Sequence, residues 1–136
     1  MTTLSPLAAT LHVAIGGGIG AALRYQTGRA MTQWLGAPIM GAFPFATLAV
    51  NAVGSLLMGL LAGWLVRTGA AMTEQTRLLL GVGVLGGFTT FSAFSLEMVM
   101  LIERGQYLFA TLYAVLSFAL GISGLMVGLA VMRMTA

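Results

Sequence analysis

Residues 86–95 read Gly-Gly-Phe-Thr-Thr-Phe-Ser-Ala-Phe-Ser, a stretch of glycine, hydroxyl and aromatic residues inside a long apolar run. The run extends from Leu78 to Ile102 and contains one charged residue, Glu97, so it predicts a membrane-spanning helix. Its centre falls near Thr90. An irregular backbone at that depth must face protein or a water-filled cavity, because lipid offers its N–H and C=O groups no partners. We therefore predict a third helix that is broken at the bilayer midplane and enclosed by the other helices.

The composition places the whole chain in a membrane. Of its 136 residues, 59% are hydrophobic and 7% are charged, and the mean hydropathy is +1.00. A water-soluble domain of this length could not hide so much apolar surface. We predict a single all-α transmembrane domain, residues 1–136, in the inner (plasma) membrane and in contact with the lipid bilayer. Its four helices are expected at about 7–32, 45–66, 76–102 and 107–132, with a loop at 33–44.

Several classes of function are excluded or disfavoured. Cysteine is absent, which excludes disulfides and thiolate metal sites. Six arginines against three glutamates are too few and too scattered to indicate nucleic-acid binding. The sequence shows no Ser-His-Asp set, paired carboxylates or metal-ligand cluster, so we predict that the chain is not an enzyme. We expect no cleaved signal peptide, because no positive residue precedes the first apolar run.

Small residues recur at four-residue spacing along the predicted helices. Gly16 and Gly20 lie in the first helix, and Ser55, Gly59 and Gly63 lie in the second. Small residues at this spacing let helix backbones approach closely. Ser5-Pro6 predicts the start of the first helix, with serine as the cap.

The arginines are divided equally between the two sides of the membrane. Four spans put both termini on one side, and the same number of arginines lies on each side: Arg67, Arg77 and Arg133 with the termini, and Arg24, Arg29 and Arg104 opposite. Orientation normally follows an excess of Lys and Arg on the cytoplasmic side. A chance balance explains the tally, but so does dual topology, which permits an antiparallel homodimer.

The polar residues at membrane depth are uncharged hydrogen-bond donors. A cation pathway normally contains carboxylates, and a proton-coupled antiporter needs a titratable group in the bundle. Donors without acids suit an anion, and the positive edge of a phenylalanine ring can also face one. Two roles are open for Glu97, which can pair with an arginine near the surface or line an entrance. The donors and rings singled out are Thr47, Asn51, Thr89, Thr90, Phe91, Ser92, Phe94, Ser95, Tyr113 and Ser117.

Three blocks of sequence resemble the Fluc family of small fluoride channels. They are Gly20-Ala-Ala-Leu-Arg24-Tyr25, then Thr47-Leu-Ala-Val-Asn51-Ala-Val-Gly54, and then residues 86–95. The third block is specific, whereas the first two would be weak alone. With the hydropathy plan, the resemblance covers nearly the whole chain.

The resemblance implies an antiparallel dual-topology homodimer with two passive fluoride pores. It implies one structural Na⁺ at the dimer centre, held by the backbone carbonyls of Gly86 and Thr89. Phe91, Phe94 and Asn51 would line the pores, Tyr113 and Ser117 would continue a polar track on the fourth helix, and Arg24 would stand at the aqueous vestibule. The channel would let fluoride that entered as HF leave the cell.

One position departs from the family pattern. The family often has a second hydroxyl residue one turn after Ser117, where this chain has Gly121. Either water replaces that hydroxyl, or the track is shorter, since Ser123 does not replace it. Two other functions remain as alternatives. A small multidrug-type antiporter would need a glutamate in the first helix, which has none, and an accessory structural subunit would not explain the polar break.

Overall fold

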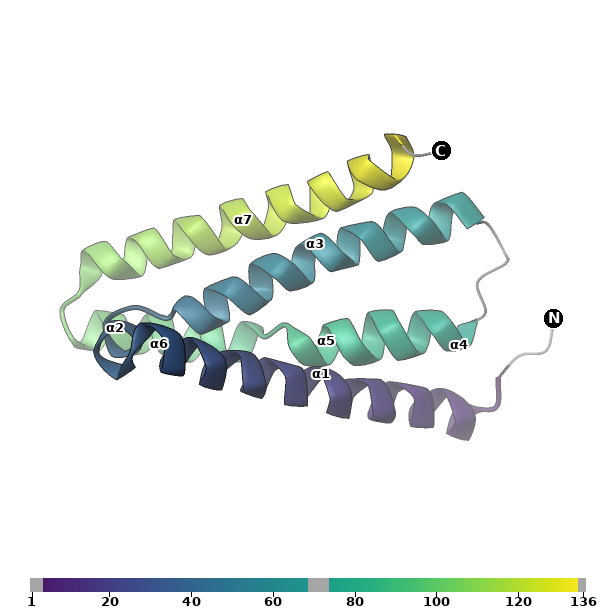
Figure 1. The fold of residues 1–136 in the computed structure, drawn as a ribbon, viewed down its shortest axis with the longest axis horizontal. Helices are drawn as coiled ribbons and strands as arrows, with labels where there is room; N and C mark the ends of the chain where they lie inside the picture. The colour runs from purple at the N-terminus through teal and green to yellow at the C-terminus, as the bar shows by residue number, and fades with distance from the viewer. Residues whose placement is uncertain (1–3, 69–73, 135–136) are drawn as a thin grey trace.

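The computed structural model describes residues 4–68 and 74–134 as a bundle of helices. Within these residues, four helical stretches are long and apolar enough to cross a membrane, which agrees with the predicted all-α membrane protein. The start of α1 and the end of α7 lie at the same end of the bundle (Figure 1). The elements are α1 (Pro6–Leu35), α2 (Ala37–Ala42), α3 (Phe45–Thr68), α4 (Glu74–Thr76), η2 (Arg77–Leu85), α5 (Gly86–Phe88), α6 (Phe91–Glu103) and α7 (Tyr107–Met134).

The first connection differs from the prediction, because the expected loop at 33–44 contains the short helix α2. The first helix continues to Leu35 and stops at Gly36, whose φ of 85° favours glycine. A proline in the first turn then starts α2, since proline fixes a helical φ. At the other end of α1, the Ser5 hydroxyl accepts a hydrogen bond from the Ala8 N–H at 3.2 Å, as the sequence predicts.

The helices pack as two close pairs, and glycines make both contacts possible. In the first pair α1 lies against η2 and α5, where a methyl group on Gly20 would overlap the backbone of Val84. In the second pair α3 lies against α7, where a methyl group on Gly128 would overlap the backbone of Leu56. The four-residue spacing of small residues thus correctly predicted close backbone approach.

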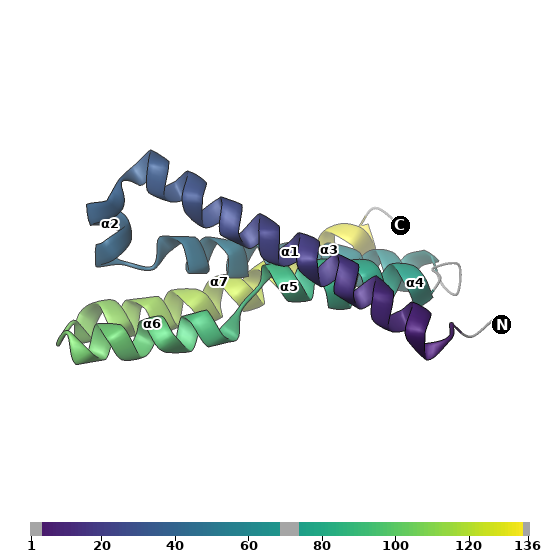
Figure 2. The same ribbon diagram turned by 90° about the horizontal axis from the view of Figure 1, so that it is seen from below.

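Before its midpoint, the third span contains both α-helix, in α4 and α5, and π-helix, in η2. The segment η2 is a π-helix of nine residues, and the Gly86 N–H at its end donates to the carbonyl of Gly81, five residues earlier. Runs of π-helix are rare and frequently accompany functional sites. Here the π-helix lies against α1, and Figure 2 shows α1 crossing the third span near α5 and then diverging from α6.

Candidate ion pathway

The third span is extended at Thr89 and Thr90, between α5 and α6. Their backbone angles are φ −79°, ψ 159° and φ −155°, ψ 122°. Threonine favours this geometry because its branched side chain suits extended backbone, and because its hydroxyl can cap the next helix. The Thr90 hydroxyl does so by accepting from the Ala93 N–H at 3.2 Å. The extended pair lies inside the stretch 86–95.

Side chains from two other helices satisfy the backbone of this extended pair. The Asn51 amide on α3 donates through Nδ2 to the Thr90 carbonyl at 3.0 Å and accepts from the Thr90 N–H at 2.8 Å. The Arg24 guanidinium on α1 donates to the Thr89 carbonyl at 3.1 Å. These bonds replace the helical partners that the extension removes, so the irregular backbone does not depend on lipid.

A cavity of about 420 Å³ lies beside the extended pair, between α3, α6 and α7. Its walls carry hydroxyl, amide and aromatic groups and no charged side chain. The Ser117 hydroxyl oxygen is buried in the protein without a hydrogen-bond partner. The residues that line the cavity are Asn51, Gly54, Ser55, Met58, Gly86, Thr89, Thr90, Phe91, Phe94, Ser117, Phe118, Gly121 and Leu125.

Two phenylalanine rings form one side of this cavity. The ring centroids of Phe91 and Phe94 are 5.6 Å apart. Phe94 continues inward and meets the Tyr113 ring at 5.0 Å, whereas the Phe91 side is 73% exposed in the single chain. The Phe91 ring therefore lines the cavity and also leaves most of its surface uncovered by the chain.

Three of the predicted pore residues do not line this cavity. Tyr113 is fully buried, and its hydroxyl donates to one carboxyl oxygen of Glu97 at 2.6 Å. Thr47 donates to the other oxygen of Glu97 at 2.7 Å. The Ser95 hydroxyl donates to the carbonyl of Phe91 at 3.0 Å. The structure therefore places Asn51, Phe91, Phe94 and Ser117 at the cavity, and it does not bring Thr47, Ser95 or Tyr113 to its walls.

The structure shows hydrogen-bond partners of Glu97 that the sequence did not predict. Its two oxygens accept hydroxyl donors from α3 and α7, and it also lines a smaller cavity of about 200 Å³ that includes Arg104. This geometry does not decide between pairing with an arginine and lining an entrance, because Arg104 lines the same cavity as Glu97. Its three-residue spacing from Phe94 was the available signal that Glu97 belongs on the face of α6 that turns inward.

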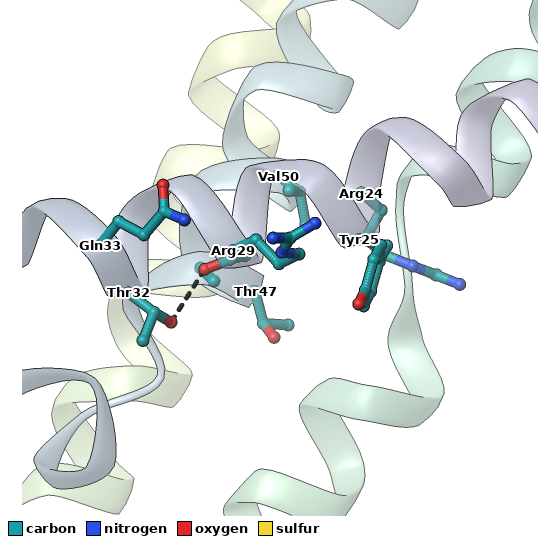
Figure 3. Close-up of a pocket in the computed structure, with 9 residues that line it drawn as sticks. Arg24, Tyr25, Arg29, Thr32, Gln33, Thr47 and Val50 are labelled. Atoms are coloured by element: carbon teal, nitrogen blue, oxygen red, sulfur yellow. Dashed lines mark hydrogen bonds between the residues drawn. The ribbon is translucent and has the colours of Figure 1, made fainter. Parts of the chain in front are cut away.

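A second large cavity, of about 560 Å³, lies between α1 and α3. Arg24 and Arg29 both line it, with Tyr25 stacked at 6.0 Å from the Arg29 guanidinium carbon. Figure 3 shows the two arginine side chains pointing in different directions, Arg24 toward the segment that contains the extended pair. This cavity is positively charged, because two arginines and no acidic residue line it, whereas the 420 Å³ cavity has no charged lining residue.

The carbonyls predicted to hold a cation differ in their surroundings. In a continuous helix the Gly86 carbonyl would accept from the Thr90 N–H, but that N–H donates to Asn51 instead. The Gly86 oxygen therefore suits a hard cation, which prefers oxygen ligands. The Thr89 carbonyl already accepts from Arg24, and a bound cation would have to share it with that positive charge.

Comparison with known proteins gives a consistent result. A family described as CrcB-like protein, camphor resistance (CrcB), matches residues 11–129. A protein of Erythrobacter litoralis named fluoride-specific ion channel FluC is 62% identical over the whole of both chains. A protein of the same name from Novosphingobium aromaticivorans is 57% identical, over 93% of this chain and 98% of its own.

Proposed function

The chain belongs to the CrcB-like family, and we propose on that premise that it is a passive channel that carries fluoride out of the cytoplasm. Its relatives are named as fluoride-specific ion channels, a class of transporter and not of enzyme. We place this multi-pass protein in the inner membrane. The observation that carries the proposal is the 420 Å³ cavity at the extended pair, whose walls offer hydrogen-bond donors and ring edges but no carboxylate.

The donors at this cavity match what a fluoride ion needs. Fluoride is small and strongly hydrated, so a pore must replace its water with many donors that each release the ion again. An amide group has two N–H bonds, and Asn51 uses one of them on Thr90, which leaves the other for the ion. The Ser117 hydroxyl has no protein partner. The edges of Phe91 and Phe94 would add weak positive charge.

Entry of the anion would be favoured by the positive cavity between α1 and α3. Arg24 and Arg29 raise the local concentration of anions there, because their charges are not neutralised by an acidic lining residue. We retain Thr47 and Tyr113 as predicted residues of the path beyond Phe94. Their hydroxyls donate to Glu97, and the Tyr113 ring contacts the Phe94 ring that lines the cavity.

A second copy of the chain, in the opposite orientation, would close the pore. The exposed face of Phe91 leaves the cavity open on one side, and an apolar ring at that depth packs well against another protein surface. The sequence tally of three arginines on each predicted side gives no excess of positive charge that would set one orientation. These two features support the antiparallel homodimer with two pores that we propose.

A structural Na⁺ at the dimer centre is the remaining part of the proposal. The Gly86 carbonyl of each copy would bind it, and the Thr89 carbonyl would contribute through the lone pair that Arg24 does not use. When bound, this ion would neutralise carbonyl oxygens that the extended backbone leaves without helical partners. The chain's own residues would still conduct the fluoride.

Fluoride efflux from liposomes tests the proposed function. The purified protein is reconstituted with fluoride inside, and an ion-selective electrode records the release. We expect rapid efflux that requires a compensating current, supplied by valinomycin and K⁺, because a channel moves net charge. An antiporter would instead respond to a pH gradient. A rate equal to that of protein-free liposomes would refute the proposal.

A further inference from the structure

Gly121 on α7 faces a hydroxyl from another helix. If Gly121 carried a Cβ atom, its nearest neighbour would be the Ser55 hydroxyl oxygen on α3, at 3.6 Å. Both residues line the 420 Å³ cavity and an adjoining cavity of about 310 Å³, and Ser117 lines both cavities as well. The space that glycine leaves at position 121 is therefore bordered by the side chain of Ser55.

The hydroxyl of Ser55 is free to bind something in these cavities. A serine in a helix usually donates to the carbonyl four residues earlier, as Ser95 and Ser123 do here at 3.0 and 2.6 Å. Within residues 4–68 and 74–134, Ser55 makes no such bond and has no other protein partner. On the opposite helix the Ser117 hydroxyl also has no protein partner, and its oxygen is buried. Ser55 and Ser117, from two helices, thus line the same pair of cavities.

We propose that Ser55 is a fluoride-binding residue of the pore and supplies, from α3, the hydroxyl donor that Gly121 does not supply from α7. Ser55 lies four residues after Asn51 and so one turn further along the same face. The donors of α3 then continue past the extended pair, beside Ser117. This inference rests on the proposed function, since it assigns a further ligand to the same ion.

If Ser55 served only packing, Ser55→Ala would conduct like the wild type. Ser55 begins a row of small residues that continues with Gly59 and Gly63, and a packing role would depend on its size and not on its hydroxyl. Alanine keeps that small size and removes only the hydroxyl. Serine at position 121 returns a hydroxyl to the same region from the other wall, and the 3.6 Å distance is an ordinary van der Waals contact.

The test compares fluoride efflux in liposomes for four proteins: wild type, Ser55→Ala, Gly121→Ser and the double variant. We expect Ser55→Ala to slow efflux about tenfold or more, the effect of losing one hydrogen bond to a charged group. We expect the double variant to recover to within about threefold of wild type, a difference below one hydrogen bond. Ser123→Ala is the matched control, because its hydroxyl already donates to backbone, and it should conduct like wild type.

The wild-type result tests the proposed function, and the variants test the assignment of Ser55. If the wild type conducts and Ser55→Ala conducts equally well, the assignment of Ser55 is wrong while the channel stands. If Ser55→Ala is slow and Gly121→Ser does not restore it, the hydroxyl does not act in the shared cavity, and the assignment is also wrong. A wild type that fails to conduct removes both. Elution in detergent, measured for every variant, shows that the dimer is intact.

Discussion

Replacing Asn51 by leucine tests whether the amide holds the extended backbone in place. Leucine has the same branching and the same number of side-chain heavy atoms, but it neither donates to the Thr90 carbonyl nor accepts from the Thr90 N–H. Each buried polar group left without a partner costs about 1–3 kcal/mol, so the two together cost roughly 2–6 kcal/mol. That is a large part of the roughly 5–15 kcal/mol that stabilises a typical folded protein.

The measurement is unfolding in mixed micelles by SDS titration, followed by helical content, with fluoride efflux recorded on the same preparation. We expect Asn51→Leu to unfold at a clearly lower SDS fraction and to conduct little fluoride. Leu57→Ile is the control, because Leu57 on α3 is 42% exposed, and it should match wild type in both assays. A variant with wild-type stability and no flux would show that the Asn51 amide does not hold the extended backbone in place, and would mean that Asn51 acts on the ion alone.

Other predictions concern packing, the pore and orientation. Gly20→Ala should lower stability by about 1–3 kcal/mol in the same SDS titration, because its methyl group overlaps the backbone of Val84, whereas Gly18→Ala should have no such cost because no atom lies near it. Phe91→Ile should elute in detergent like the wild type but lose most fluoride efflux; wild-type efflux would make Phe91 a packing residue. A reporter fused after Ala136 should be found on both sides of the inner membrane in comparable amounts, and a single location would contradict dual topology.

The helical plan could be predicted because it depends on local sequence. A continuous apolar run long enough to span the membrane specifies a helix whatever surrounds it. The close approach at Gly16 and Gly20 was predictable for the same reason, since their spacing alone puts them on one face. The short helix α2 was missed because Gly36 and Pro38 were read as loop residues, although they also end one helix and begin the next.

The partners of the polar residues could not be predicted from spacing. Asn51 and Thr90 are brought together by the packing of two helices, and no local pattern specifies that contact. The same holds for Tyr113, which shares a face of α7 with Ser117 but donates to Glu97 while the Ser117 hydroxyl stays unpaired. Residue type indicated a polar path, whereas the direction of each donor depends on the tertiary structure.

The hydrogen bonds at the extended pair also have a consequence for the order in which the helices enter the membrane. Arg24 and Asn51 both precede Thr89 and Thr90 in the sequence, so the ribosome delivers them to the membrane first. When the third span inserts, the groups that satisfy its open backbone are already present, and the chain need not pass through a stage with bare carbonyls in lipid. A circularly permuted chain that begins at Tyr107 keeps this order, whereas one that begins at Glu74 reverses it. We expect the second permutation to insert poorly.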